Sequence, residues 1–482
     1  MAEVVIVGGG VGGLATSIRL GAAGHHVTLL ERNAHLGGKL AERERDGFHF
    51  DVGPTSLTMP ELFESVFELS GSTLDNELDL VRLDPQVRYT WPDGSTLDVR
   101  DDADATAKAF EELVTGSGEA YRQLDDHGRR IWETSQRAFL ASGTNGAVSL
   151  SRRIRAARDL AAIDGWRNLS SRARQSFADP RLVQWVERYA TYSGTAPRSS
   201  PATLACLPHV ESLHGVWFPM GGMCRLRDAL VRAARRAGAT LRPGVDIETI
   251  EHTGHQVRAV RTAAGERIAA DVVVAGTDAE HVYADLAPVR PLLRRARRAR
   301  RSLSAIVIAA GVRGRTEGIA HHNVWFSTNP AAEFRQIVLE RRPAEEPTIT
   351  GTVSVVTDPS LAPAGDENWL LLVHAPPGAD IDPGPSRDLA LSVLAERGVD
   401  LRDRLQFTEV MVPRDIAERY RSPGGSLYGP AAHRRRAFSG AANRGPLRGL
   451  YLVGGSAYPG GGLPRVLIGA RAVDGLIHDD GW

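Results

Sequence analysis

The chain has 482 residues, too many for one ordinary domain and enough for two or three hydrophobic cores. Hydrophobic residues make up 42%, charged residues 24% and the formal net charge is zero, which excludes a disordered chain and argues against a general nucleic-acid binder. Cys206 and Cys224 are too few for a disulfide framework, and no metal site is expected.

The first elements predict a nucleotide-binding unit. Residues 3–32 follow the order strand, glycine-rich turn, helix and strand, and the first strand begins so close to the N-terminus that no signal peptide is expected. Residues 61 to about 205 have a mostly helical pattern, and residues 59–70 have helical spacing. A strand-rich region, 215–278, follows and ends in a short apolar run that suits a buried parallel strand.

Later strands are predicted at 304–312, 348–357 and 369–374, before a final strand at 449–455 and a helix from about 463 to 477. Strands suited to one buried sheet therefore come from three separate stretches. We expect a discontinuous cofactor domain with a substrate lobe inserted twice. The predicted boundaries are 1–80, 211–278 and 436–482 for the cofactor domain, 81–210 for a helical region and 279–435 for the substrate domain.

The N-terminal glycine run matches the dinucleotide-binding pattern G-x-G-x-x-G. Its residues are Gly8, Gly9, Gly10, Val11, Gly12 and Gly13. Gly8 permits the tight turn, Gly10 lets the backbone approach a pyrophosphate, and Gly13 allows close helix–strand packing. The helix that follows offers unpaired N–H groups to phosphate. Glu31, at the end of the second strand, is placed to accept hydrogen bonds from ribose hydroxyls.

The segment after the second strand separates FAD from a nicotinamide cofactor. It contains Leu36-Gly37-Gly38-Lys39 and, further on, Asp51-Val52-Gly53-Pro54-Thr55. This arrangement resembles the FAD-dependent oxidoreductases that include amine oxidases, protoporphyrinogen oxidase and bacterial phytoene desaturases. The resemblance implies that the Gly-Gly-basic turn lies along the flavin end of FAD. It also adds Arg32, Gly53, Pro54 and Thr55 to the cofactor site, and Val245 as a backbone clamp on the adenine.

A second glycine-rich turn lies near the C-terminus, in the sequence GLYLVGGSAYPGGGLPRVLIGA. Pro464 stands where a helix would start, and proline loses nothing at a first helical turn. The helix N-terminus would stabilise negative charge at the pyrimidine end of a reduced flavin. The expected cofactor contacts here are Gly454, Gly455, Gly461, Gly462, Leu463, Pro464 and Val466.

Further segments resemble the phytoene-desaturase-type carotenoid desaturases over essentially the whole chain. They are RYATYSG at 188–194, GVWFPMGG at 215–222, HHNVWFS at 321–327 and TDPSLAP at 357–363. The implied fold is α/β, with a discontinuous Rossmann-like FAD domain of glutathione-reductase/amine-oxidase type, a mixed α+β substrate domain and a helical membrane-facing region. Tyr458, Arg465 and Gly469-Ala470 depart from the family pattern beside the flavin, which leaves the exact substrate open.

The implied chemistry is dehydrogenation of a carbon–carbon single bond in a long isoprenoid such as phytoene or a later carotenoid. Hydride would leave to the flavin, and an allylic or polyene neighbour would delocalise the developing cation, so positioning matters more than a strong base. The candidate catalytic residues are His321, His322 and Arg188. On a strand, the two adjacent histidines would point to opposite faces, so that at most one would face a cavity.

A long apolar substrate suggests that the protein takes it from a membrane. No run of eighteen apolar residues is present, so we expect no membrane-spanning helix. The expected location is the cytoplasm, with peripheral contact to the inner face of the cell membrane. Residues 151–174 and 290–301 each carry seven arginines among apolar positions, as basic amphipathic helices do. Oxygen or a membrane quinone is the expected electron acceptor, because a second nucleotide motif is absent.

Three alternatives stay open from the sequence. One is an oxidase or dehydrogenase of an amine or a smaller natural product, and another is a redox-neutral carotenoid isomerase. A third is a binding protein for prenyl groups, like the Rab GDP-dissociation inhibitors; Glu31 and the C-terminal glycine turn argue against it.

Overall fold

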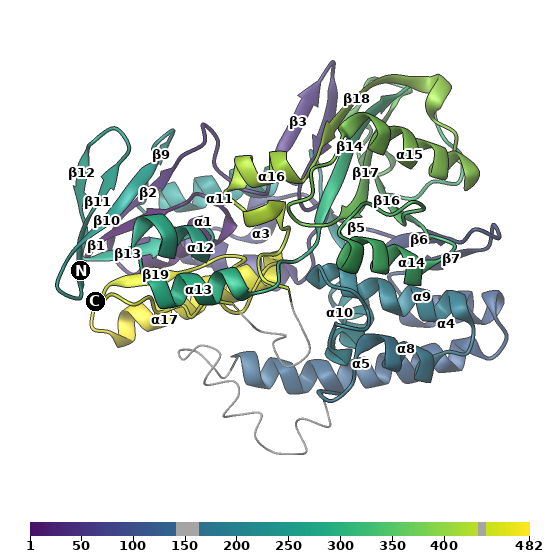
Figure 1. Cartoon of the computed structure of the whole chain (residues 1–482), viewed down its shortest axis with the longest axis horizontal. Coiled ribbons are helices and arrows are strands. Elements are labelled where there is room, and N and C mark those ends of the chain that lie inside the picture. Colours follow the sequence, from purple (N-terminus) through teal and green to yellow (C-terminus); the bar gives the residue numbers. More distant parts are fainter. Residues whose placement is uncertain (141–162, 432–439) are drawn as a thin grey trace.

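A computed structural model describes residues 1–140, 163–431 and 440–482 of the chain. Figure 1 shows two β-sheet lobes side by side, with a group of helices below one of them. Both chain termini lie on the lobe that holds the parallel sheet, far from the helical group.

The first lobe is built on a five-stranded sheet of order β19-β13-β1-β2-β9, in which every neighbouring pair is parallel. Its strands are β1 (Glu3–Val7), β2 (His26–Glu31), β9 (Thr240–Pro243), β13 (Val272–Ala275) and β19 (Leu450–Leu452). All four residues of β13 are buried, as expected where helices and a second sheet cover both faces of a parallel sheet. The sheet therefore draws its strands from three separate stretches of the chain.

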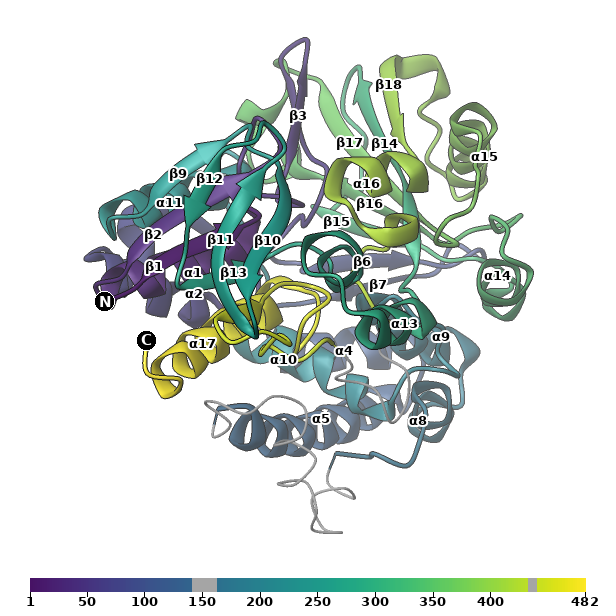
Figure 2. The same cartoon turned by 60° about the vertical axis from the view of Figure 1, so that its left-hand side comes forward.

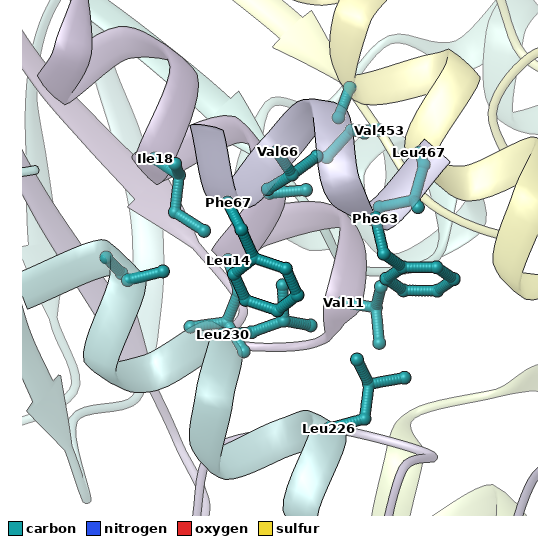
Figure 3. Packing of buried hydrophobic residues seen from close by; sticks show 14 of the residues in the cluster. Val11, Leu14, Ile18, Phe63, Val66, Phe67, Leu226, Leu230, Val453 and Leu467 are labelled. Carbon is teal, nitrogen blue, oxygen red and sulfur yellow. The ribbon is translucent and has the colours of Figure 1, made fainter. Parts of the chain in front are cut away.

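One face of this sheet packs against helices. They are α1 (Val11–Ala22), α2 (Pro60–Phe67), α11 (Cys224–Arg236) and α17 (Leu463–Asp479). Figure 3 shows Leu14 and Ile18 of α1 among Phe63 and Phe67 of α2 and Leu230 of α11. Each of these side chains is fully buried, which stabilises the lobe by roughly 1.5–3 kcal/mol per side chain.

The other face carries a small antiparallel sheet of β10 (Ile247–Thr253), β11 (Gln256–Thr262) and β12 (Arg267–Ala269), which lies in front of β1 and β13 in Figure 2. Helix α13 (Arg290–Arg298) packs near this sheet through its partly buried leucines, Leu292 and Leu293. Short elements on the same lobe are α3 (Leu74–Glu77), α12 (Ala279–His281), and the strand pair β5 (Leu80–Arg82) and β8 (Trp217–Pro219).

The second lobe is a seven-stranded mixed sheet of order β18-β14-β17-β16-β15-β6-β7. Its strands are β6 (Val87–Thr90), β7 (Thr96–Val99), β14 (Ser304–Val312), β15 (His322–Trp325), β16 (Ile349–Val353), β17 (Glu367–Ala375) and β18 (Leu405–Met411). All nine residues of β14 are buried, since it lies between β18 and β17 under other elements. Around the sheet are α14 (Pro330–Arg335), α15 (Pro383–Glu396), α16 (Pro413–Tyr420) and the hairpin of β3 (Glu42–Arg45) and β4 (Phe48–Asp51).

The helical group consists of α4 (Ala103–Leu113), α5 (Ser117–Leu140), α8 (Leu169–Ser176), α9 (Pro180–Arg188) and α10 (Leu207–His214). Its core is aromatic: the rings of Phe110 and Trp185 meet edge to face, with centroids 4.9 Å apart. Tyr89 of β6 belongs to the same buried cluster, so the helices are joined to the second sheet through their core. Figures 1 and 2 both place these helices at one end of the molecule.

The structure confirms the predicted strand at 304–312 and the C-terminal helix, and two expectations need correction. The stretch expected to be mostly helical contains β5, β6 and β7, which are only three or four residues long. The region expected to be strand-rich contains α11. The domain boundaries stay a prediction.

In the part of the chain that the structure describes, no helix is long and apolar enough to cross a bilayer, and no cluster of metal-ligating side chains occurs. Cys206 and Cys224 are free thiols.

Candidate functional site

The N-terminal glycine turn has the close contacts that its pattern predicts. Gly8 has a φ of 105° and donates its N–H to the carbonyl of Leu30. A Cβ at Gly13 would lie 2.1 Å from the carbonyl oxygen of Gly8, so only glycine fits there. Gly37 donates its N–H to the carbonyl of Gly9, which places the Gly-Gly turn directly beside the first one.

The C-terminal glycine turn lies against the N-terminal turn. A Cβ at Gly12 would lie 3.1 Å from Val466 Cγ1 and 3.4 Å from Gly454 Cα. Helices α1 and α17 also pack together, with Leu14 and Leu467 in one buried cluster. Residues at opposite ends of the chain are therefore brought to one place.

Both helix starts fit an anionic dinucleotide. Gly10 is the N-cap residue of α1 and Gly462 that of α17; neither has a side chain to cap the helix, and the first turn of each helix holds no acid. A Cβ at Gly10 would meet no atom closer than 4.0 Å, and one at Gly462 would meet none within 4 Å. Uncapped N–H groups beside open space are suited to phosphate and to a reduced flavin.

Glu31 is buried at the edge of this space and is already engaged. Its Oε2 accepts a hydrogen bond from Gly9 N at 2.8 Å, and its Oε1 accepts bonds from the backbone N and side-chain amide of Asn33. A carboxylate has about four acceptor positions, so it can still receive a ribose hydroxyl while it holds the turn.

Other residues predicted to contact the cofactor make contacts within the protein. The Arg32 guanidinium donates to the carbonyls of Glu418 and Arg419 at the end of α16, and the Val245 N–H donates to the carbonyl of Glu31. Lys39 Nζ donates to the carbonyls of Ser426 and Leu427, and burial lowers the pKa of Lys39 to about 8.

The segment 53–55 lies between this turn and the second sheet. A Cβ at Gly53 would lie 1.8 Å from the carbonyl oxygen of Lys39, so this glycine allows close packing. Pro54, which follows Gly53, is partly exposed. Thr55 Oγ1 lies 3.1 Å from His322 Nε2. Thr55 thus connects the predicted cofactor segment to a predicted catalytic residue.

The two histidines do not point to opposite faces. His321 precedes β15 instead of lying in it, so the alternation of a strand does not apply, and its ring contacts that of His322 with centroids 4.6 Å apart. His321 Nδ1 lies 2.7 Å from Thr357 Oγ1, while Nε2 is buried without a partner among the described residues. Burial lowers the pKa of His322 to about 4 and that of His321 well below its usual value. Both rings are therefore neutral near pH 7.

Arg188, at the end of α9, is surrounded by the aromatic rings of three tyrosines. Its Nη1 donates to Tyr89 OH at 2.8 Å and to Tyr192 OH at 3.3 Å, and its guanidinium carbon is 5.1–6.0 Å from the ring centroids of Tyr89, Tyr189 and Tyr192. Removing a charge from water costs on the order of several kcal/mol, while a desolvated cation–π contact contributes about 2 kcal/mol. The three rings and the two hydroxyls together therefore offset a cost of this size.

Three residues near Arg188 were not predicted for the site. They are Tyr192, Tyr428 and His374 on β17, and the Arg188 charge affects the pKa of each, lowering that of His374 together with burial to about 4. Tyr192 lies in the RYATYSG segment, which the sequence did single out. His374 and Tyr428 gave no signal, because nothing in their neighbouring residues differs from an ordinary strand or loop.

Tyr428 links the surroundings of Arg188 to the C-terminal glycine turn. A Cβ at Gly461 would lie 2.9 Å from Tyr428 Cα and 3.0 Å from Tyr428 Cβ, so Tyr428 packs directly on the C-terminal turn. Burial raises the pKa of Tyr428, and the charge of Arg465, just beyond that turn, opposes this rise. Tyr428 and Arg465 thus lie directly beside the C-terminal glycine turn, at the predicted flavin end of the site.

Comparison with known proteins agrees with this geometry. Residues 11–472 match the family described as flavin containing amine oxidoreductase. The chain is 31% identical over 99% of its length to a 4,4′-diapolycopene oxygenase of Methylomonas sp. and to a 4,4′-diaponeurosporene oxygenase of Staphylococcus aureus (strain Mu50 / ATCC 700699), and covers 98% of each.

Solved structures share the fold. An oxidoreductase from Methanosarcina mazei superposes with a TM-score of 0.66 at 16% identity, over 98% of this chain and 99% of that one. Putrescine oxidase with bound putrescine gives 0.64 at 14% identity, over 99% of both chains. The predicted fold class and the predicted FAD cofactor are confirmed, while the membrane-facing role of the helical region stays a prediction. The chain belongs to the flavin-containing amine oxidoreductase family and is an FAD-dependent oxidoreductase.

Proposed function

We propose that this enzyme oxidises a long linear polyene of the carotenoid type. The observation that carries the proposal is the match over 99% of the chain to two enzymes named as oxygenases of 4,4′-diapolycopene and 4,4′-diaponeurosporene. FAD, when bound, would accept a hydride from a carbon beside the conjugated chain, and the resulting cation would either add water and lose a proton, which gains oxygen, or lose a proton from the next carbon, which forms a double bond.

The residues of the chain contribute binding and orientation. The glycine turns at 8–13 and 454–462 would hold the cofactor through backbone N–H groups, with Glu31 on the ribose side. His321 and His322 are buried and neutral, which suits a site that positions an apolar molecule. A polyene stabilises a developing cation by delocalisation, so a strong base is unnecessary.

Two oxidations of such a substrate are possible, and the relatives favour one of them. Their names describe oxygenation, whereas the sequence motifs led us to expect desaturation of a carbon–carbon bond. We therefore place oxygenation first and desaturation second. Putrescine oxidase and a fatty acid isomerase share only the fold at 13–14% identity, so they do not favour an amine substrate or an isomerisation.

Peripheral contact with a membrane is part of the proposal, because the substrate is insoluble in water. Trp166 is 71% exposed, and tryptophan favours the interface of a bilayer. The arginines at 290, 294 and 298 of α13 are also exposed. Residues 151–162, half of the segment 151–174, lie outside the described residues. The electron acceptor is proposed to be oxygen or a quinone.

Pigment analysis tests this function. The gene is expressed in separate bacterial hosts that accumulate phytoene, 4,4′-diaponeurosporene or 4,4′-diapolycopene, and the extracts are separated by chromatography with mass detection. We expect a product that has gained oxygen from one of the conjugated substrates; loss of hydrogen alone would assign the enzyme to desaturation. Unchanged pigments in every host, from protein that purifies with bound FAD, would contradict the proposal.

A further inference from the structure

Arg188 has hydrogen-bond donors that the fold leaves unused. An arginine side chain has five N–H donors. Those of Nη1 reach Tyr89 and Tyr192, but Nε and Nη2 have no acceptor among the residues that the structure describes. The side chain keeps part of its surface accessible, so these donors face space and are not sealed into the core.

No carboxylate in the described chain forms an ion pair with Arg188. The nearest acid in the cluster is Glu211, and Tyr189 stands between them, with its OH donating to Glu211 Oε2 at 2.8 Å. Burial raises the pKa of Glu211, as expected for a carboxyl group that no cation contacts directly. The cation is thus held by neutral hydroxyls and ring faces, without the anion that usually accompanies a buried arginine.

His374 is a second residue with a hydrogen-bonding group that has no partner. Its Nδ1 is buried and has no hydrogen-bond partner among the described residues. Its ring is near enough to Arg188 for that charge to lower the pKa of His374, and the imidazole can act as donor or acceptor according to its tautomer. His374 is opposite Ala305 in the β14–β17 pair, and Leu303, two residues before Ala305, donates its N–H to the carbonyl of Gly194, so that α9 with the turn after it and β17 are linked through this segment.

This region adjoins the cofactor turns through Tyr428, which packs on Gly461 and donates its N–H to Ser302 Oγ. The next residue, Leu303, donates its N–H to the carbonyl of Gly194, two residues beyond Tyr192. A molecule that extends from the flavin end of the site past Tyr428 would meet the guanidinium.

We propose that Arg188, with Tyr192 and His374, forms a subsite that binds an oxygen atom on the end of the polyene. This proposal rests on the proposed function for the identity of the apolar chain. The ligand chemistry that fits is an aldehyde or carboxylate oxygen, which accepts the free Nε and Nη2 donors and supplies the missing negative or partial negative charge. A hydrocarbon end would leave these donors unpaired.

With this subsite, the enzyme would prefer a substrate or product that already carries oxygen at one end. Arg188 would be a specificity-determining residue, because its contacts are with the polar end and not with the carbon that is oxidised. Buried donors discriminate strongly against an analogue that lacks the matching oxygen.

The test uses the FAD-loaded protein in detergent with three probes: 4,4′-diaponeurosporene, its terminal aldehyde and its terminal carboxylic acid. Affinity is measured from the change in flavin and polyene absorbance, and KM and kcat are measured where turnover occurs. Arg188→Gln should weaken binding of the aldehyde and the acid about tenfold to hundredfold more than it weakens binding of the hydrocarbon. Arg188→Lys, which keeps the charge, should recover part of the affinity for the acid.

Arg198→Gln is the control, since Arg198 is exposed, and it should match the wild type with every probe. FAD content and melting temperature are recorded for each variant. An equal loss for all three probes would show that Arg188 is structural and would overturn the subsite. If Arg188→Gln does not fold, Tyr192→Phe must show the same discrimination, and its failure to do so would also overturn the proposal.

The two proposals can fail separately. Selective binding of the oxygenated probes without turnover of any polyene would refute the proposed function and leave the subsite standing. Turnover of the hydrocarbon with no effect of Arg188→Gln on probe preference would refute only the subsite.

Discussion

A substitution at Gly10 distinguishes its effect on folding from its effect on FAD binding. Its φ is −70°, which any residue adopts, and a Cβ there would meet no atom of the described chain closer than 4.0 Å. Gly10→Ala should therefore leave the apoprotein as stable as the wild type or more stable by about 0.5 kcal/mol, because the unfolded chain loses freedom. A methyl group in the space meant for the pyrophosphate should instead lower FAD affinity by about tenfold or more.

The comparison variant is Gly13→Ala, where a Cβ would lie 2.1 Å from the Gly8 carbonyl oxygen. This change should destabilise the apoprotein itself by about 2 kcal/mol. Denaturant unfolding of the apoproteins and FAD titration measure the two effects. If Gly10→Ala binds FAD normally, the pyrophosphate does not approach this residue.

The buried histidines predict sensitivity to acid. The folded-state pKa of His322 is about 4 and its usual value is 6.5, so the unfolded chain binds more protons between these values. Stability from keeping His322 neutral is complete above pH 6.5 and is lost as the pH falls toward 4, by up to about 3 kcal/mol. His374 is shifted in the same direction and adds to the loss.

His322→Gln removes this titration and keeps a side-chain amide near Thr55, to which His322 Nε2 is bonded. The variant should show a flatter dependence of the unfolding free energy on pH between 4 and 6.5, measured by urea unfolding across that range. A pH dependence identical to that of the wild type would mean that His322 is protonated without cost in the folded protein.

Helix α13 shows what an amphipathic pattern does at the level of one element. The sequence predicted a basic amphipathic helix that suits an anionic lipid surface, and its apolar residues Leu292, Leu293 and Ala296 pack against the buried cluster of the first lobe. The stripe therefore anchors the helix to its own protein. The exposed side of the helix consists mainly of arginines, so any membrane attraction of α13 is electrostatic.

We expect that replacing Arg290, Arg294 and Arg298 together by Gln weakens binding to vesicles that contain anionic lipid, because each cation near such a surface contributes about 1 kcal/mol. These three arginines are exposed and form no ion pair with a described residue. Co-sedimentation at low and high salt measures the loss, which should vanish at high salt.

A matched triple change of Arg198, Arg235 and Arg258 to Gln removes the same charge from exposed, scattered positions. If this control lowers vesicle binding as much as the α13 variant, net charge alone governs attachment and α13 is not a membrane surface.

At the scale of the whole molecule, the sequence predicted the cofactor lobe far better than the rest. Glycine turns such as Gly8–Gly13 and the buried strand at 272–275 are local patterns with a direct physical cause, and both lie where they were expected. The strands β5 to β7 were missed because they are short and border helices, which leaves too few residues to show alternation.

The polar groups near Arg188 could not be assembled from the sequence. Tyr89, His374 and Tyr428 come from widely separated strands and loops, and only the pairing of the second sheet with α9 brings them together. Their chemistry depends on which side chains are buried side by side, a property of tertiary packing that no local spacing encodes.

The central claim is that one FAD is held by glycine turns from both ends of the chain. Hydrogen–deuterium exchange of the protein with and without FAD, followed by mass spectrometry of its peptides, tests it most directly. We predict that FAD slows exchange in peptides covering residues 9–14 and, to a similar extent, in peptides covering 454–466. Protection of the N-terminal turn alone, with unchanged exchange at 454–466, would contradict the claim.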